Sequence, residues 1–279
     1  MRTRIISAAV AIAFAIFVLA LAHTWVFNLT LAAIAVGALY ELFKALGLIK
    51  YRAECAVCFA FASVDMLIGM VYRKDFFTFF NVKIYGLLFV TGILLLYLKN
   101  RNSYAFSLPF TLIGITLIIC YSFHTLLWMV DDYESFGVFA VVLTLAGAWL
   151  ADSGAYFVGT FFGKNKLCPE ISPKKTIEGV VGGTVVNGVL LLIISGVYTA
   201  FINKDVEVRF GVVFIAGMLC AIVGLVGDLA ASEIKRQAGI KDYGNIMPGH
   251  GGIMDRFDSV LTVAPFMYWL ISQGWIVKF

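Results

Sequence analysis

A charged segment at residues 232–259, SEIKRQAGIKDYGNIMPGHGGIMDRFDS, interrupts an otherwise apolar sequence. It brings carboxylates, basic side chains and a histidine together in one turn-rich stretch. Carboxylate oxygens are ligands that Mg²⁺ prefers, and lysine and arginine side chains hold phosphate groups. Gly249, Gly251 and Gly252 would let the backbone of this stretch approach a ligand closely. The residue types therefore predict a site for a metal ion and a phosphorylated substrate.

Two carboxylates border this segment on consecutive apolar runs. Asp228 ends one run and Asp255 opens the next, so antiparallel spans would bring both to the same membrane rim. If the first helix continues past Asp228, then Asp228, Ser232 and Arg236 lie on one helical face, four residues apart. Asp255 and Asp258 are three residues apart and would also share a face.

Other sites can be built from the same residues. A hydrolase triad of Ser232, His250 and an aspartate lacks the G-x-S-x-G motif and would leave the basic residues without a role. Zinc is disfavoured because His250 has no cysteine or second nitrogen ligand near it. A solvated loop is the remaining alternative.

Two upstream features could belong to the same site. Asp152 lies within a long apolar run, where a carboxylate needs water, a cation or a partner. It either lines a cavity and contacts a cation or forms a hydrogen bond with a neighbouring helix. Lys174 and Lys175 precede a helix that Thr176 could begin, which is a natural place for a phosphate. An ordinary positively charged cytoplasmic loop explains these lysines equally well.

The elements that must position these residues are membrane helices. The chain has 279 residues and is 61% hydrophobic but only 14% charged, whereas soluble domains carry about 25% charged residues. Its apolar runs reach about 20 residues and are continuous rather than alternating, which argues against a β-barrel. We therefore predict an all-α polytopic integral membrane protein with about nine transmembrane helices and no nucleic-acid partner. The spans are expected at roughly 5–22, 25–45, 55–72, 83–98, 105–130, 136–162, 178–202, 210–230 and 258–277.

The distribution of lysine and arginine predicts a cytoplasmic N-terminus, because most of them then fall in cytoplasmic segments. The polar loops 163–177 and 231–257 are cytoplasmic in this topology. We assign residues 1–130, with spans one to five, to an N-terminal scaffold and candidate dimerisation region. Residues 131–279, with spans six to nine, form the expected catalytic region.

The polar segment resembles the phosphatidate cytidylyltransferase (CDP-diacylglycerol synthase) family. That family's signature reads S-x-x-K-R-x₄-K-D-x-G and, after a short gap, P-x-H-G-G-x-x-D-R-x-D. The matching residues are Ser232, Lys235, Arg236, Lys241, Asp242, Gly244, Pro248, His250, Gly251, Gly252, Asp255, Arg256 and Asp258. The upstream stretches DSGAYFVG and SPKKTIEG also resemble the family's pattern, whereas the N-terminal half agrees only as a set of spans. Met247 departs from it, since Leu, Ile or Phe is expected there.

The resemblance implies that phosphatidate and CTP react to give CDP-diacylglycerol and pyrophosphate, with Mg²⁺. Asp228 and Asp255 would hold the metal, with Asp258 and Asp152 as further candidates. The phosphates would be bound by Lys235, Arg236, Lys241 and Arg256, by Lys174 and Lys175, and by the backbone at Gly249, Gly251 and Gly252. Ser232 and His250 would orient phosphate oxygens or a metal-bound water, and Asp242 completes the catalytic set.

The implied partners are CTP, phosphatidate, membrane lipids and a second copy of the chain. The expected location is a bacterial inner membrane, with the site facing the cytoplasm. One alternative is a CTP-dependent transferase that acts on another lipid phosphate, such as an ether lipid. Another is an ion-coupled transporter that uses Asp152 and Asp228. A transporter predicts helices broken at the midplane and internal repeats, and the sequence shows neither.

We predict that Asp255→Asn abolishes turnover without unfolding the protein, because the change removes a charged metal ligand and keeps the side-chain shape. Turnover and thermal unfolding of the purified variant test this prediction together. Retained activity would contradict the role assigned to Asp255.

Overall fold

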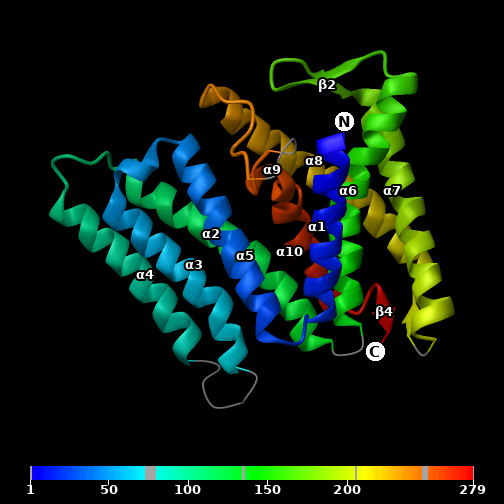
Figure 1. Cartoon of the computed structure of the whole chain (residues 1–279), viewed down its shortest axis with the longest axis horizontal. Coiled ribbons are helices and arrows are strands. Elements are labelled where there is room, and N and C mark those ends of the chain that lie inside the picture. Colours follow the sequence, from blue (N-terminus) through cyan, green and yellow to red (C-terminus); the bar gives the residue numbers. More distant parts are fainter. Residues whose placement is uncertain (1, 73–79, 134–135, 205, 247–250, 279) are drawn as a thin grey trace. The chain divides into compact units, whose positions relative to one another are not determined.

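Apolar helices joined by short loops make up the computed structural model, which describes residues 2–72, 80–133, 136–204, 206–246 and 251–278 (Figure 1). Each of the first eight expected spans falls largely within one helical stretch. The contacts divide the chain into two units. Met1–Leu127 and Asp242–Asp255 form the first unit, and Trp128–Lys241 and Arg256–Phe279 form the second. The predicted division into 1–130 and 131–279 is one of function, and it stays a prediction.

The first unit consists of the N-terminal helices and part of the polar segment. Its helices are α1 (Arg2–Ala20), α2 (Trp25–Ala45), the 3-10 turn η1 (Leu48–Lys50), α3 (Arg52–Tyr72), α4 (Phe80–Lys99) and most of α5 (Ser107–Asp132). The Thr24 side chain begins α2 by accepting a hydrogen bond from Val26 N. Gly47, with φ of 67°, follows the end of α2, a position that favours glycine. Asn28 Nδ2 donates to the Met66 carbonyl at 2.9 Å and so ties α2 to α3, which run side by side in Figure 1.

A buried polar group joins three helices of this unit. The Asp65 carboxylate of α3 accepts a hydrogen bond from Tyr85 of α4 and lies 3.2 Å from His124 Nδ1 of α5. Asp65 is buried, and a buried carboxylate requires such partners. The cluster therefore fixes how α3, α4 and α5 pack.

The second unit contains three long helices and the rest of the polar segment. Its elements are α6 (Gly137–Phe162), β1 (Lys166–Cys168), β2 (Ser172–Thr176), α7 (Ile177–Val197), the π-helical turn η2 (Tyr198–Ile202), β3 (Glu207–Val208), α8 (Phe210–Gln237), α10 (Val260–Ser272) and β4 (Val277–Lys278). The short helix α9 (Met254–Phe257) lies at the boundary between the units. Strand β1 pairs antiparallel with β2, and β3 pairs antiparallel with β4. The β1–β2 hairpin lies at one end of α6 and α7, which run side by side (Figure 1).

Small residues allow α6, α7 and α8 to pack closely. A Cβ atom added to Gly183 would lie 2.6 Å from the Ala155 backbone nitrogen, and one added to Gly217 would lie 2.8 Å from Gly188 Cα. Asn187 is fully buried between the same helices, and its Nδ2 donates to Gly147 O at 3.0 Å and to Gly217 O at 2.8 Å. Close backbone contact and interhelical hydrogen bonds are the interactions that hold helices together in lipid.

Five helical segments in the described part of the chain are long and apolar enough to cross a membrane: Trp25–Ala45, Ser107–Asp132, Gly137–Phe162, Ile177–Ile202 and Phe210–Gln237. This confirms the predicted fold class, an all-α integral membrane protein, while the count of nine spans stays a prediction. The last expected span, 258–277, differs from the structure. Its helix α10 ends at Ser272, and the chain then turns so that β4 can pair with β3.

We predict that Asn187→Leu lowers the free energy of unfolding by about 1–3 kcal/mol, because two interhelical hydrogen bonds are lost. Denaturation in detergent micelles measures the change. Val185→Ala is the control, since Val185 lies on the same helix with 45% of its surface exposed and should shift stability by less than about 0.5 kcal/mol. Equal stability of the two variants would contradict the bridging role of Asn187.

Candidate active site

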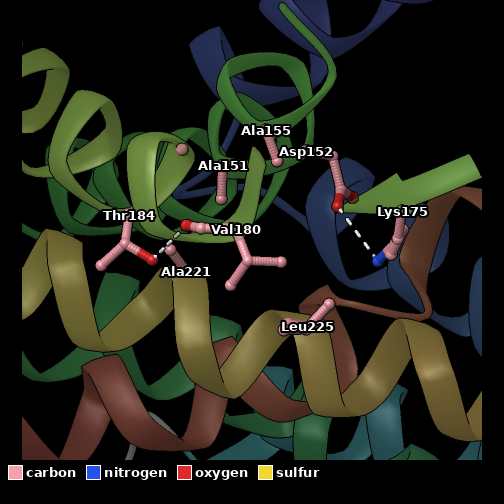
Figure 2. Close-up of a pocket in the computed structure, with 9 residues that line it drawn as sticks. Ala151, Asp152, Ala155, Lys175, Val180, Thr184, Ala221 and Leu225 are labelled. Atoms are coloured by element: carbon pink, nitrogen blue, oxygen red, sulfur yellow. Dashed lines mark hydrogen bonds and ion pairs between the residues drawn. The ribbon is translucent and has the colours of Figure 1, made fainter. Parts of the chain in front are cut away.

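Lys175 meets two carboxylates at the end of the β1–β2 hairpin. Its ammonium group forms an ion pair with Asp228 Oδ2 of α8 and lies 3.8 Å from Asp152 Oδ1 of α6. Asp152 and Lys175 point toward each other in Figure 2. The side chains of Lys175 and Asp228 are 20% and 18% exposed, whereas that of Asp152 is 50% exposed. One cation therefore offsets two carboxylates, one of which is open to solvent or to a ligand.

The loop that carries Lys175 is closed by specific hydrogen bonds. Thr176 begins α7, as predicted, because its Oγ1 accepts from Gly179 N at 3.1 Å. Glu178, in the first turn of α7, accepts from the backbone nitrogens of Lys164 and Asn165. These bonds fold the chain back between the end of α6 and the start of α7. They place Lys175 just before α7 rather than at a free loop tip.

A third carboxylate, Asp258, extends the cluster. Ser259 lies between it and Asp152: Ser259 N donates to Asp258 Oδ1 at 2.7 Å, and Ser259 Oγ donates to Asp152 Oδ2 at 3.4 Å. Asp258 is buried and lies between α9 and α10, outside the five long apolar helices. The negative charges of Asp228 and Asp258 repel each other. The site therefore carries more negative charge than Lys175 offsets.

This surplus of carboxylates bears on a magnesium ion. Carboxylate oxygens are the donors that Mg²⁺ prefers, and a cation would relieve the repulsion between Asp228 and Asp258. In the described part of the chain, however, no group of three histidine, cysteine or acidic side chains forms a ready-made metal position. The donor chemistry thus fits a magnesium ion, with Asp228 and Asp258 as the residues that would hold it beside Lys175.

Helix α8 continues into the polar segment as far as Gln237, which confirms that Asp228, Ser232 and Arg236 share one helical face. Ser232 and Lys235 are buried near the end of this helix, and the charge of Lys235 favours the ionised form of Asp258. Arg236 is exposed, and its Nε donates to the Ile171 carbonyl at 3.1 Å. Arg236 therefore holds the β1–β2 hairpin against α8, a contact that the sequence did not predict.

The remaining predicted residues fall into three groups. Lys174, Lys241, Asp242 and Arg256 are exposed. His250 and Gly249 lie outside the described residues. Asp255, Gly251 and Gly252 belong to the first unit, so the expected approach of Asp255 to Asp228 stays a prediction.

Asp255 closes the loop in which it lies. Its Oδ2 accepts from Tyr243 N at 2.8 Å and from Gly252 N at 3.0 Å. Gly251 has φ of 86°, and a Cβ atom there would lie 2.8 Å from the same oxygen. Only glycine adopts this conformation without strain and leaves room for the carboxylate.

An apolar pocket lies beside the Asp152–Lys175 pair in the second unit (Figure 2). Its walls come from α6, α7 and α8 and are mainly small or aliphatic: Ala151, Ala155, Val180, Gly183, Ala221 and Leu225. The arrangement places an ammonium group next to an apolar wall.

Two residues of this site were missed by the sequence analysis. Ser259 bridges two carboxylates, and Trp149 Nε1 donates to the Arg256 carbonyl at 2.9 Å, which fixes the start of the last helical segment. Ser259 directly follows Asp258 and could have been suspected from that position. Trp149 gave no such signal, because it lies within an apolar run far from the polar segment.

Residues 2–273 match the cytidylyltransferase family, so the chain belongs to this family. Its relatives include phosphatidate cytidylyltransferases of bacteria. That of Bacillus subtilis (strain 168) is 36% identical over 214 residues, which cover 74% of this chain and 76% of that protein. That of Staphylococcus haemolyticus (strain JCSC1435) is 34% identical over 219 residues, which cover 76% and 78%. That of Staphylococcus aureus (strain COL) is 40% identical over 143 residues, which cover 51% and 53%.

We predict that Lys175→Gln lowers turnover on the order of 10²-fold, because the cation between Asp152 and Asp228 is lost where anions must gather. The matched control is Lys174→Gln, whose side chain is exposed, and its loss should be less than about tenfold. Steady-state rates of both variants, with thermal unfolding measured alongside, decide the matter. Equal losses would mean that the ion pairs of Lys175 have no special part in the reaction.

Proposed function

We propose that this chain transfers the cytidylyl group of CTP to phosphatidate, giving CDP-diacylglycerol and pyrophosphate for phospholipid synthesis. Membership of the cytidylyltransferase family and the names of the bacterial relatives support this function. The observation that carries it is the cluster of Asp152, Lys175, Asp228 and Asp258 beside an apolar pocket. The ammonium group of Lys175 in this cluster can bind an anionic headgroup.

The chemistry needs charge compensation more than a base. A phosphate monoester is already mostly ionised at neutral pH, so its oxygen can attack the α-phosphorus of CTP directly. A new oxygen–phosphorus bond forms as the bond to the pyrophosphate oxygen breaks. The barrier comes from bringing anions together and from charge that develops on the leaving pyrophosphate.

The residues of the second unit can supply much of this compensation. Lys175 and Lys235 would bind phosphate oxygens, and Ser232 lies one turn from Asp228 on the same face of α8. A magnesium ion held by Asp228 and Asp258 would add positive charge at the phosphates. Asp152 and Asp255 are further candidates for that metal, as the sequence resemblance implies. Arg236, Lys241, Arg256 and His250 would bind or orient the triphosphate.

The membrane setting follows from the two substrates. Phosphatidate cannot leave the bilayer cheaply, whereas CTP is soluble in water, so the site must lie at a membrane rim. We infer nine spans, a cytoplasmic N-terminus and a site that faces the cytoplasm of a bacterial inner membrane. The excess of lysine and arginine in the segments then placed in the cytoplasm supports this topology. A homodimer is part of the same proposal.

A transporter is disfavoured by the helices that carry the candidate ion-coupling groups. Helix α6 continues without a break through Asp152, and α8 does so through Asp228. Secondary transporters typically bind substrate and coupling ions at discontinuous helices. The unbroken helices therefore favour an enzyme.

We predict that the protein purified in detergent releases pyrophosphate from CTP when phosphatidate and Mg²⁺ are both present, and not when either is omitted. An ether-lipid phosphate in place of phosphatidate tests the alternative substrate class. Release with the ether lipid alone would mean that the substrate is an ether-lipid phosphate and that the reaction is still cytidylyl transfer. No release from folded protein with either lipid would overturn the proposed function.

A further inference from the structure

Glu41 lies far from the polar segment in sequence, yet its carboxylate contacts that segment within the first unit. It is on the last turns of α2 and is only 3% exposed. Its Oε2 accepts a hydrogen bond from Met254 N at 2.8 Å. Met254 is the first residue of α9 and directly precedes Asp255. The contact therefore joins an N-terminal helix to the residue next to a candidate metal ligand.

The surrounding backbone leaves room for a carboxylate and little else. A Cβ atom added to Gly244 would lie 2.2 Å from Glu41 Oε1, and one added to Gly252 would lie 2.3 Å from both carboxylate oxygens. Both glycines belong to the signature that the sequence analysis identified. Their lack of a side chain is thus explained by Glu41, in addition to any approach of the backbone to substrate.

Gly37 on α2 makes room for Ile253, the residue that precedes Met254 in the loop. A Cβ atom added to Gly37 would lie 2.4 Å from Ile253 Cδ1. Gly37 and Glu41 are four residues apart and so lie on one face of α2. Ile253 and Met254 are consecutive, and each meets one of these two positions. One helical face therefore binds two successive residues of the loop, one by packing and one by a hydrogen bond.

The Glu41 carboxylate also has a buried oxygen that is not satisfied. Among the described residues, Oε1 has no hydrogen-bond partner. A buried acceptor without a partner costs free energy, so Glu41 is a poor choice if stability alone decides the residue at this position. A leucine would fill similar space without an unpaired oxygen, but it would leave the Met254 amide without an acceptor. The carboxylate is explained by its hold on the Met254 amide and the two glycines.

We propose that Glu41 is a positioning residue for the signature loop, a name that we give to the two arms 242–246 and 251–255. It holds the arms 242–246 and 251–255 together and so fixes the start of α9, where Asp255 lies. Asp255 itself joins the same arms through the amides of Tyr243 and Gly252. Glu41 and Asp255 thus hold the loop from two sides. The inference rests on the proposed function for its effect on turnover, but not for its effect on the loop.

The test compares Glu41→Leu with Glu41→Gln in the full-length protein in detergent. Leucine removes the acceptor for Met254 N, whereas glutamine keeps one oxygen that can accept this bond. We expect Glu41→Leu to lower kcat by about tenfold or more, since a small misplacement of catalytic groups is costly. Glu41→Gln should stay within about threefold of the unchanged protein. The thermal unfolding temperature of Glu41→Leu should stay close to that of the unchanged protein, since loss of the unpaired Oε1 offsets loss of the acceptor for the Met254 amide.

Hydrogen–deuterium exchange supplies a readout that does not depend on activity. Peptides that cover residues 242–255 should exchange about tenfold faster in Glu41→Leu than in the unchanged protein, and other peptides should not change. Glu54→Leu is the matched control. Glu54 is in the same unit, is 2% exposed and also has an oxygen without a hydrogen-bond partner among the described residues. It should leave loop exchange and kcat unchanged.

Two results would overturn the proposal. One is loop exchange in Glu41→Leu that stays within about twofold of the unchanged protein. The other is a loss of activity that follows the unfolding temperature alike in the Glu41→Leu and Glu54→Leu variants, which would indicate a general structural role. If the unchanged protein shows no cytidylyl transfer, the proposed function fails, and loop exchange alone then decides the role of Glu41.

Discussion

The ion pairs that Lys175 forms with Asp152 and Asp228 constrain the second unit more than any other contact described. Charged groups near lipid are expensive unless they are paired, and here three of them come from three separate elements. Lys175 can reach both carboxylates only if the β1–β2 hairpin folds back over the ends of α6 and α8. Glu178 and Arg236 secure that fold by binding its backbone. The requirements of one ammonium group thus determine the shape of a whole loop.

The charges of this cluster also bear on the reaction, because both substrates are anions. Three carboxylates, those of Asp152, Asp228 and Asp258, gather in this cluster, and the positive charges of Lys175 and Lys235 act on them. CTP and phosphatidate are anions, and a site of carboxylates alone would repel both. The lysines beside the carboxylates reduce this repulsion.

Local patterns in the sequence were enough to predict the helices and one face of the site. The apolar runs have about the length that a membrane span requires. Asp228, Ser232 and Arg236 are four residues apart, so they share a helical face once α8 continues past Asp228. Features that depend on tertiary contacts were not accessible in this way. Glu41 reads as an ordinary polar residue near the end of a span, because the loop that it holds lies about two hundred positions further along the chain. The end of α10 at Ser272 was also missed, since pairing of β4 with β3 interrupts an apolar run that could otherwise continue as helix.

The length of α8 has a consequence for the depth of the site in the bilayer. Its 28 residues extend about 42 Å, whereas the hydrocarbon core of a bilayer is about 30 Å thick. The helix is thus longer than the hydrocarbon core is thick, so its polar end extends toward the headgroups. A thicker or thinner bilayer would change the tilt of this helix and move Asp228 relative to the headgroup phosphates. Lipid composition can therefore tune how easily the headgroup of a substrate reaches the site, through bilayer thickness rather than through any binding pocket.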